Sequence, residues 1–395
     1  MNVCMVVYNY YEIDRRVRNY AESLAERGDN VDVIALRWKL GRDKYGKLNG
    51  VNVYRIQNRE YNEKTAIDHL LKILLFFIRG SILILRRHVK YHYDIIHIHN
   101  VPDFLVFMGL LPRLLCARVI LDIHDILPEF YSQKFGKEMS SPTIRMLRGV
   151  EKLSVRFADY VIVANDLWRQ QIIARDKISP GKCASILNYP SVESLRQPPK
   201  REHSETLTII YPGTISYHHG VDVAIRAIDI VKRQLPSVKL HIYGRSGDMK
   251  YYSFLKQLIE ELNLRQNVKM FDPVSYESLQ NIYLNYDIGI VPKRGGIFAE
   301  QAFSTKIFDY MAFGLPIIAS RTKIDEYYFD DSMIMFFQPG NHEDLARCIL
   351  ELNSDREKSQ SLIEHAFQFI AKNRWAQKKS IYYEILAELV SSKKS

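Results

Sequence analysis

The chain has 395 residues, of which 47% are apolar, 12% aromatic and 25% charged. This length exceeds one ordinary hydrophobic core, so two domains are expected, and the apolar content excludes general disorder. Most of the net charge of +10 belongs to the first half: residues 1–190 hold 29 basic and 20 acidic side chains, and residues 191–395 hold 26 and 25. The basic half suggests an anionic partner such as nucleic acid or an acidic membrane surface, and the nearly neutral half suggests a small ligand.

The spacing of the cysteines and the length of the apolar runs indicate in which compartment the protein works and whether it spans a membrane. The four cysteines lie far apart without CxxC or mixed Cys/His spacing, which argues against a disulfide framework and a zinc site and fits a reducing compartment. The apolar residues after Met1 are expected to form a first strand, not a signal peptide, because no basic stretch precedes them. The longest apolar stretch, Leu70 to Leu85, contains Lys72 and Arg79 and is too short and too charged for a membrane span.

Short runs rich in β-branched residues alternate with helical patterns along the chain, which is typical of parallel α/β folds. In the first half, the predicted strands cover residues 3–7, 31–36, 94–99, 119–123 and 160–164. In the second half, they cover residues 207–211, 238–243, 267–271, 287–291 and 315–320. The helix after the first strand ends at Gly28 and has one apolar face, formed by Val17, Tyr20, Ala21 and Leu24.

A linker separates the two α/β series. Residues 188–206 contain three prolines and no apolar period. We therefore expect one domain over residues 1–190 and a second over residues 191–370. The chain from Asp355 to Val390 has an amphipathic helical pattern, and its last part, residues 371–395, is expected to pack back on the first domain.

One histidine and three carboxylates follow a β-branched strand in the segment VILDIHDILPE, residues 119–129. They are Asp122, His124, Asp125 and Glu129. Ligand sites of α/β folds form at the carboxyl ends of strands, so this cluster predicts chemistry, with a capped strand end as the alternative. His97 and His99 share one face of the preceding strand, but no third ligand is spaced to complete a metal site. We interpret these two as cleft lining or core.

Two segments of the second half combine glycine turns with cations. Gly213 lies in a loop between a strand and a helix that begins near Gly220, and the amides of such a loop suit phosphate. The segment 292–320 is more specific, because its glycine loop carries Lys293 and Arg294 and the helix after it carries Lys306 and Asp309. These residues offer cations for phosphate and an acid for ribose hydroxyls. The alternative is a solvated helix edge with an ion pair between residues three apart.

These segments together resemble the retaining glycosyltransferases of the GT-B fold, family 4, which includes enzymes of bacterial polysaccharide and lipopolysaccharide synthesis. The resemblance covers nearly the whole chain and rests on DRRV (14–17), DIHDILPE (122–129), YPGT (211–214), HHGVD (218–222), FSTKIFDYMAFGLPIIAS (303–320) and RTKIDEYYF (321–329). It implies two facing Rossmann-like α/β domains with a cleft between them. It also implies a nucleotide-sugar donor on the second domain, an acceptor on the first, and transfer without a bound metal.

The resemblance implies roles for individual residues. His124 corresponds to the family's cleft histidine near the donor sugar, and Lys306 lies in the donor loop. Asp309 replaces the usual ribose-binding glutamate. Thr214 and His219, beside Gly213, stand where the family has the arginine and lysine that hold the diphosphate, so Lys306, Lys293, Arg294 or backbone amides must meet the phosphate charge. The first glutamate of the family's acidic pair falls on Gln301, with Glu300 its immediate neighbour. We name Gln301 and Glu300 with His124 as catalytic candidates. Ser304 and Thr305 favour a helix start near residue 304, which leaves Gln301 on the loop before it, and the Glu300 side chain is expected to point to solvent.

A basic stripe marks the helical pattern around residues 70–90. Lys72, Arg79 and Arg86 recur every seven residues among leucine, isoleucine and phenylalanine. This composition suits a helix at a membrane interface. The alternative is a buried helix with a solvated basic edge, since Gly80 and Ser81 interrupt the pattern.

We thus expect a hexosyltransferase of cell-surface polysaccharide synthesis that needs no cofactor and uses a UDP- or GDP-linked sugar as substrate. Its expected partners are a glycan or lipid-linked acceptor and an anionic membrane, with no nucleic acid, on the cytoplasmic face of the inner membrane. Two alternatives stay open. One is a nucleotide-sugar epimerase of the same fold, and the other is a non-catalytic partner of another transferase that binds nucleotide or membrane.

Overall fold

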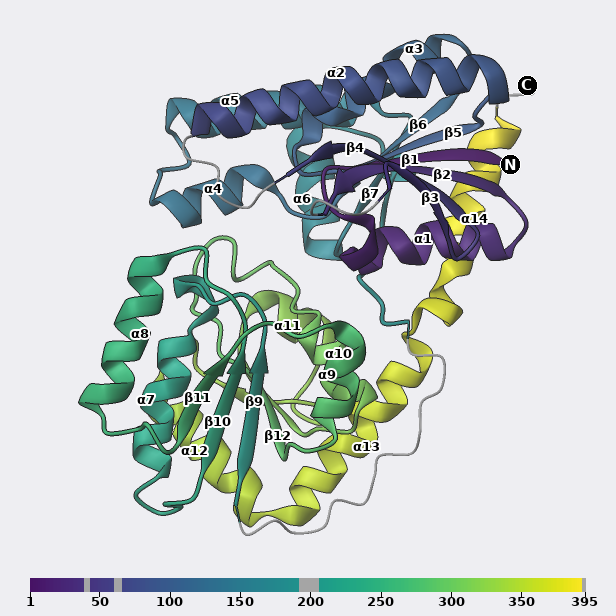
Figure 1. Cartoon of the computed structure of the whole chain (residues 1–395). Helices are drawn as coiled ribbons and strands as arrows, with labels where there is room; N and C mark the ends of the chain where they lie inside the picture. Colours follow the sequence, from purple (N-terminus) through teal and green to yellow (C-terminus); the bar gives the residue numbers. More distant parts are fainter. Residues whose placement is uncertain (39–42, 60–65, 192–205, 393–395) are drawn as a thin grey trace. The chain divides into compact units, whose positions relative to one another are not determined.

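A computed structural model describes residues 1–38, 43–59, 66–191 and 206–392 (Figure 1). The chain divides into two compact units: Met1–Tyr189 with Trp375–Ser395, and Pro190–Arg374. Most of the predicted linker, residues 192–205, lies outside the described residues. Each unit is an α/β domain built on a largely parallel sheet.

The sheet of the first unit has eight strands in the order β3-β4-β2-β1-β5-β6-β7-β8. Only the β3–β4 pair is antiparallel, as expected for an edge hairpin joined by a tight turn. The strands are β1 (Asn2–Val7), β2 (Asn30–Arg37), β3 (Tyr45–Leu48), β4 (Val51–Asn58), β5 (Ile95–His99), β6 (Arg118–Ile123), β7 (Tyr160–Val163) and β8 (Cys183–Ser185). The five strands predicted for this half are confirmed within one or two residues.

Helices pack on this sheet. They are α1 (Arg15–Glu26), α2 (Ala66–Tyr91), α3 (Leu110–Leu114), α4 (Leu127–Phe135), α5 (Pro142–Phe157), α6 (Asp166–Asp176) and α14 (Trp375–Ser391), with 3-10 turns η1 (Tyr11–Ile13), η2 (Asp103–Gly109) and η3 (Pro180–Lys182). Asp14 caps α1 by accepting a hydrogen bond from Val17 N, and the predicted apolar face of α1 is buried. The last helix, α14, returns to this unit and adds Tyr382 and Leu386 to its core.

The sheet of the second unit has six parallel strands in the order β11-β10-β9-β12-β13-β14. They are β9 (Thr208–Pro212), β10 (Lys239–Tyr243), β11 (Val268–Phe271), β12 (Ile288–Val291), β13 (Ile317–Ser320) and β14 (Met335–Phe337). The helices are η4 (Tyr217–His219), α7 (Val221–Val231), α8 (Met249–Glu261), α9 (Tyr276–Tyr283), α10 (Lys306–Ala312), α11 (Lys323–Tyr328), α12 (His342–Ser354) and α13 (Arg356–Lys372). Because the strands are parallel, the loops after β9, β12 and β13 leave the same edge of the sheet.

Candidate functional site

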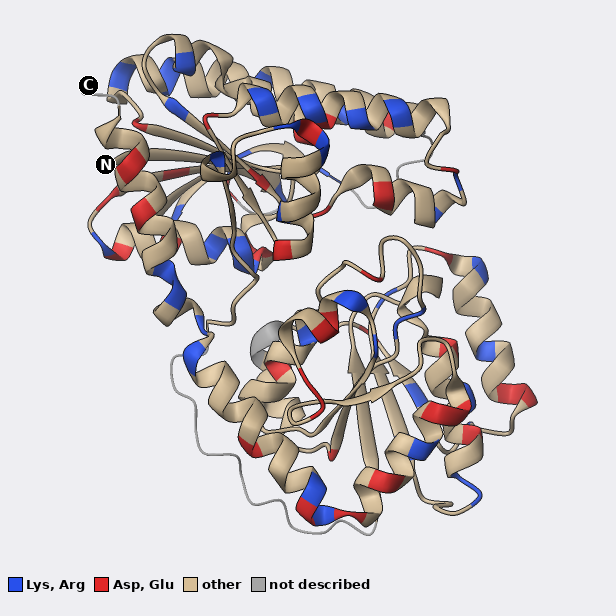
Figure 2. Ribbon diagram, turned by 180° about the vertical axis from the view of Figure 1, so that it is seen from behind, with Lys and Arg blue, Asp and Glu red and all other residues tan. Residues whose placement is uncertain are grey.

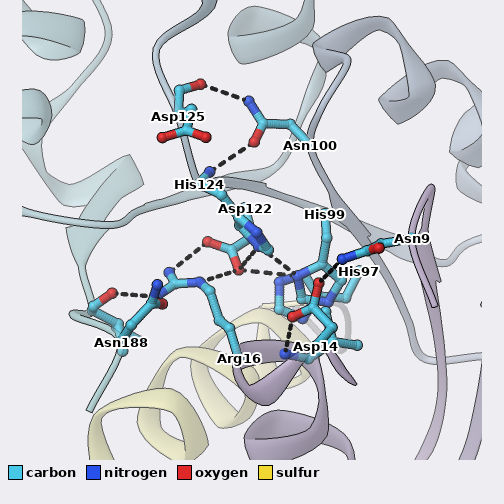
Figure 3. Close-up of polar contacts among 12 residues, drawn as sticks. Asn9, Asp14, Arg16, His97, His99, Asn100, Asp122, His124, Asp125 and Asn188 are labelled. Carbon is cyan, nitrogen blue, oxygen red and sulfur yellow. Dashed lines mark hydrogen bonds and ion pairs between the residues drawn. The ribbon is translucent and has the colours of Figure 1, made fainter. Parts of the chain in front are cut away.

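The centre of the first-unit site is Asp122, near the carboxyl end of β6 (Figure 3). Its carboxylate is fully buried and forms a two-pronged ion pair with Arg16 of α1, with 2.8 Å between Nε and Oδ2 and 2.6 Å between Nη2 and Oδ1. The third guanidinium nitrogen, Arg16 Nη1, donates to Ile186 O at 2.6 Å and to Asn188 Oδ1 at 2.8 Å. Arg16 thereby joins α1, β6 and the chain after β8.

Two histidines also contact the Asp122 carboxylate. His99 Nδ1 lies 3.0 Å and His124 Nε2 lies 3.1 Å from Asp122 Oδ2. Burial by itself would raise the pKa of Asp122, but the Arg16 guanidinium and His124 hold that pKa well below its usual range. The ionised carboxylate is therefore an acceptor within hydrogen-bond distance of both imidazoles, and His99 Nδ1 also lies 3.2 Å from His124 Nε2.

Asn100 fixes the backbone that carries His124. Its Oδ1 accepts a hydrogen bond from His124 N at 2.7 Å, and its Nδ2 donates to Asp125 O at 3.0 Å (Figure 3). The same Nδ2 donates to Asp103 Oδ1 at 2.6 Å. Burial raises the pKa of both Asp103 and Asp125 to about 6. Asn100 thus bonds to the backbone of two successive residues in the loop after β6, which fixes the position from which the His124 side chain extends.

The predicted convergence of three carboxylates is wrong for Glu129. This residue is buried on α4 and accepts hydrogen bonds from Gln171 and Arg175 of α6, each at 2.6 Å. The cause is helical geometry, because α4 begins at Leu127 and directs Glu129 to its neighbouring helix. Glu129 therefore belongs to a structural ion-pair cluster with Arg175.

His97 and His99 form the candidate metal cluster in the described part of the chain, and Asp122 supplies the third ligand atom that the sequence spacing did not reveal. The three ligand atoms lie within 4.8 Å of one another. A cation bound there would lie beside the Arg16 guanidinium, which already contacts both oxygens of Asp122. His97 instead contacts the Tyr382 hydroxyl of α14 at 2.8 Å, and burial lowers its pKa well below the ordinary value. The donor set therefore fits a packed core better than a metal centre.

In the second unit, two loops are joined at a close approach between backbones. Gly220 adopts a φ of 66°, and a Cβ on this residue would lie 1.8 Å from Pro292 O. Arg294 N also donates to His218 O at 3.0 Å. The loop after β9 and the loop after β12 are therefore fixed against each other, which brings His219, Lys293 and Lys306 to one cavity of about 120 Å³.

Lys306 supplies the charge of this cavity. It begins α10 and lies against Gly213, where a Cβ would meet Lys306 Cε at 2.5 Å. Among the residues that the structure describes, no acidic side chain forms an ion pair with Lys306, and its Nζ lies 5.2 Å from the centre of the Tyr211 ring. Burial, together with the charge of Lys293, lowers the pKa of Lys306 to about 8. An ammonium group held in this way favours an anionic ligand.

The two other predicted cations are already neutralised. Lys293 is buried and bonds to Asp325 at 2.6 Å and to Thr322 Oγ1 at 3.1 Å. Arg294 pairs with Asp222 and lies over the Tyr217 ring at 4.5 Å. Both residues therefore shape the loop, and Lys306 is left to meet the charge of a ligand.

Thr214 and His219, which stand where the family has a basic pair, carry no positive charge. Burial and the charge of Lys306 hold the pKa of His219 well below its ordinary value, so this imidazole is neutral. Ser216 Oγ lies 2.9 Å from His219 Nδ1. Thr214 accepts a hydrogen bond from the Tyr211 hydroxyl through its backbone oxygen at 2.9 Å. This side of the cavity therefore offers neutral polar groups.

Gln301 and Asp309 replace the acidic pair of the family, and Glu300 is the neighbour of Gln301. The three side chains lie in different environments. Gln301 lies in the loop before α10, as the predicted helix start near residue 304 requires, since α10 begins at Lys306. Asp309 is buried in the first turn of α10. Glu300 Oε2 accepts a hydrogen bond from Lys323 N at 3.0 Å, at the start of α11. The expectation that Glu300 points only to solvent is therefore wrong.

Two family models match this chain. The model of the glycosyl transferases of group 1 matches residues 194–369, and that of the glycosyl transferase 4-like domain matches residues 12–188. The chain belongs to the group 1 glycosyltransferases. An uncharacterized glycosyltransferase of Methanocaldococcus jannaschii is 24% identical over an alignment of 340 residues, and the match covers 81% of this chain and 80% of that relative.

Solved structures show that this transferase has the GT-B fold. Anabaena HepE in complex with UDP and glucose has a TM-score of 0.74 at 16% identity, and the match covers 98% of this chain and all of HepE. The lipopolysaccharide outer core galactosyltransferase WaaB in its apo form has a TM-score of 0.63 at 15% identity, and the match covers both chains fully.

Sequence reasoning gave no role to Arg16 or Asn100 of this transferase. Arg16 carries a signal that could have revealed it, because a charged side chain next to Val17 and four residues before Tyr20 falls on the buried face of α1. Its partner Asp122 lies 106 residues away, and only the folded sheet shows the pairing. Asn100 follows a strand of the predicted sheet, but two of its side-chain hydrogen bonds, with His124 N and Asp125 O, depend on the neighbouring loop after β6.

Proposed function

We propose that this group 1 glycosyltransferase transfers a hexosyl group from a UDP- or GDP-linked sugar to a glycan or lipid-linked acceptor with retention of configuration. The observation that carries the proposal is Lys306, whose partly buried side chain lines the second-unit cavity. A nucleotide diphosphate is an anion of suitable chemistry for this position. HepE, which is similar in fold, was solved with UDP and glucose.

Charge development explains the proposed chemistry. When the bond between the sugar and the diphosphate breaks, negative charge grows on the departing phosphate, and a preorganised cation stabilises it. Lys306 supplies this cation, and His219 and the backbone of the Gly213 loop supply neutral contacts. In a front-face reaction the departing phosphate also takes the acceptor proton, so the chain needs no separate base. We propose that no resident metal takes part, because Lys306 itself supplies the positive charge.

The first unit supplies the acceptor side of the proposal. Its loop after β6 holds His124 by a backbone bond to Asn100 and a side-chain bond to Asp122. The basic first half of the sequence suits an acceptor that carries a phosphate-linked lipid. WaaB, another transferase of this fold, acts in the lipopolysaccharide outer core according to its name. We propose a role in cell-surface polysaccharide synthesis on the cytoplasmic face of the membrane.

A donor screen tests the proposal. Thermal stability is measured with UDP- and GDP-linked sugars, since a ligand at about 100 times its Kd stabilises the protein by about 2.7 kcal/mol. Lys306→Gln should remove the stabilisation, and the matched control Lys256→Gln, an exposed residue of α8, should retain it. A wild-type protein stabilised by no nucleotide sugar would contradict the proposed donor class.

Product analysis separates the remaining alternatives. With the stabilising donor and a lipid-linked acceptor, NMR should show a glycoside with the anomeric configuration of the donor. A changed nucleotide sugar formed without any acceptor would instead identify an epimerase. Donor binding without turnover on any acceptor would identify a non-catalytic partner protein.

A further inference from the structure

Helix α2 has two apolar faces, and only one of them is buried against the rest of the first unit. Ile73, Phe76 and Ile84 are buried against the domain. Gly80 belongs to the same inward face, because a Cβ there would lie 2.1 Å from Met108 Cε of η2. The glycine that interrupts the sequence pattern is therefore the point where α2 crosses η2.

The opposite face of α2 is apolar and exposed. At about 100° of rotation per residue, its exposed apolar side chains fall within roughly 140° of arc. Ile67 is 71% exposed, Leu71 is 60% exposed and Val89 is 61% exposed. The other members are Leu70, Leu74, Leu75, Ile78 and Ile82. Soluble surfaces rarely present so long a continuous apolar stripe without a partner.

Helix α3 extends this surface. Leu110, Leu111, Leu114 and Leu115 are all exposed, with Leu114 at 73%. A hydrogen bond of 3.1 Å between His88 Nε2 and Leu115 O fixes the end of α3 beside the last turns of α2. We call the exposed apolar residues of α2 together with these four leucines the α2–α3 face.

A basic edge runs along the same side of α2. Lys72, Arg79, Arg86 and Lys90 lie within about 40° of one another around the helix, next to the apolar stripe. The single acidic residue of α2, Asp68, pairs with Lys72 at 2.9 Å, and the other three cations have no acid on this helix. Figure 2 shows blue bands of lysine and arginine on the helices at the upper edge of the first unit, which include α2.

We propose that the α2–α3 face docks the protein on the surface of an anionic lipid bilayer. The acyl region takes the exposed leucines and isoleucines, and the anionic headgroups take the basic edge. No helix in the described part of the chain is long and apolar enough to cross a membrane, so α2 lies in the interface plane. This inference goes beyond the proposed function, since it requires neither donor binding nor turnover.

Vesicle flotation of the full chain tests this docking. The wild-type protein should float with vesicles of phosphatidylglycerol and phosphatidylcholine at low salt, and high salt should weaken the binding. An apolar variant, Leu71→Gln with Ile78→Gln, and a basic variant, Arg79→Gln with Arg86→Gln, should each bind at least tenfold more weakly. Only the basic variant should lose its dependence on salt.

Matched controls change the same number of similar side chains elsewhere. Met249→Gln with Leu284→Gln removes two exposed apolar side chains of the second unit, and Arg233→Gln with Arg265→Gln removes two exposed cations. Both controls should float like the wild-type protein. Because every changed side chain is exposed, each variant should keep the wild-type Tm and its nucleotide-sugar stabilisation.

Two results would overturn the inference. One is a wild-type protein that ignores anionic vesicles at low salt. The other is a wild-type dimer that the apolar variant converts to a monomer without any change in vesicle binding, which would assign the α2–α3 face to a second copy of the chain.

Discussion

Arg16 and Asp122 lie 106 residues apart in the sequence and form a buried ion pair through two parallel contacts of 2.8 and 2.6 Å. The pair orients His124, because the same Asp122 oxygen that accepts from Arg16 Nε also contacts His124 Nε2. Asn188 Oδ1, bonded to Arg16, connects this cluster to the end of the first unit. The pair thus combines a structural role with the positioning of a candidate catalytic residue.

Arg16→Met should destabilise the protein by about 3–5 kcal/mol, because it leaves a buried carboxylate without its cation. The native pKa of Asp122 is held well below its unfolded value of about 3.9, so this stability is present above that value and is lost as the pH falls through the native pKa. The difference in unfolding free energy between wild type and variant should therefore be full at pH 7 and shrink below about pH 4. Denaturant unfolding at several pH values measures it.

The control for this variant is Arg18→Met, on the same helix. Arg18 forms a partly exposed pair with Glu22 at 2.8 Å, so its loss should cost less than about 1 kcal/mol. An equal loss of stability from Arg16→Met and Arg18→Met would show that the buried Arg16–Asp122 pair stabilises the protein no more than the partly exposed pair does.

His124→Ala should abolish transfer, with turnover at least a hundredfold lower, and leave the fold intact. The side chain is partly exposed and is held by Asp122, so its removal opens no large cavity. The measurement combines turnover with Tm, and His365→Ala, an exposed histidine of α13, is the matched control. Wild-type turnover in purified His124→Ala would refute the catalytic assignment.

Donor affinity should fall about tenfold between pH 7 and pH 9, because Lys306 must be protonated to hold the diphosphate. Its pKa is lowered to about 8 in the free protein, and a bound anion raises it, so affinity is full below pH 8 and declines above it. Calorimetric titration with a nucleotide sugar avoids the ionisation of a terminal phosphate. Lys306→Arg, which stays charged, should bind with little dependence on pH over this range.

A pH-independent affinity in the wild-type protein would remove Lys306 from the phosphate contact. His219 does not contribute to the pH dependence of donor affinity, because its pKa lies well below the ordinary value and the imidazole stays neutral over the whole range. The same titrations with Lys256→Gln control for general effects of surface charge.

The regular parts of the fold were predictable because each strand carries its own β-branched run and each helix its own period. Strands β3, β4, β8 and β14 were not among the ten predicted strands. Of these, β8 and β14 have only three residues each, which is too few to show an alternation. The ion pair of Arg16 with Asp122 and the neutralisation of Lys293 by Asp325 depend on packing between distant segments. The sequence showed the basic edge of α2 but not its exposed apolar face, because apolar residues surround the whole helix and only the fold shows which are buried.

The donor loop yields the last prediction, which concerns Glu300, Gln301 and Asp309. Gln301 lies in the loop before α10, from which its amide can both donate to and accept from sugar hydroxyls. Asp309 is buried in the first turn of α10 and can accept from a ribose hydroxyl. Glu300 contacts Lys323 N at the start of α11, which is a structural role.

These environments predict three different outcomes for alanine substitution. Asp309→Ala should weaken nucleotide binding by about 10- to 100-fold, since it removes a charged hydrogen bond, and Gln301→Ala should mainly lower turnover, by about tenfold. Glu300→Ala should leave turnover within about twofold and lower stability by about 1 kcal/mol, because a helix start loses its acceptor. Donor affinity, turnover and Tm of each variant distinguish these cases. Unchanged nucleotide affinity in Asp309→Ala, or an inactive Glu300→Ala beside an active Gln301→Ala, would overturn this assignment and move the sugar contact to Glu300.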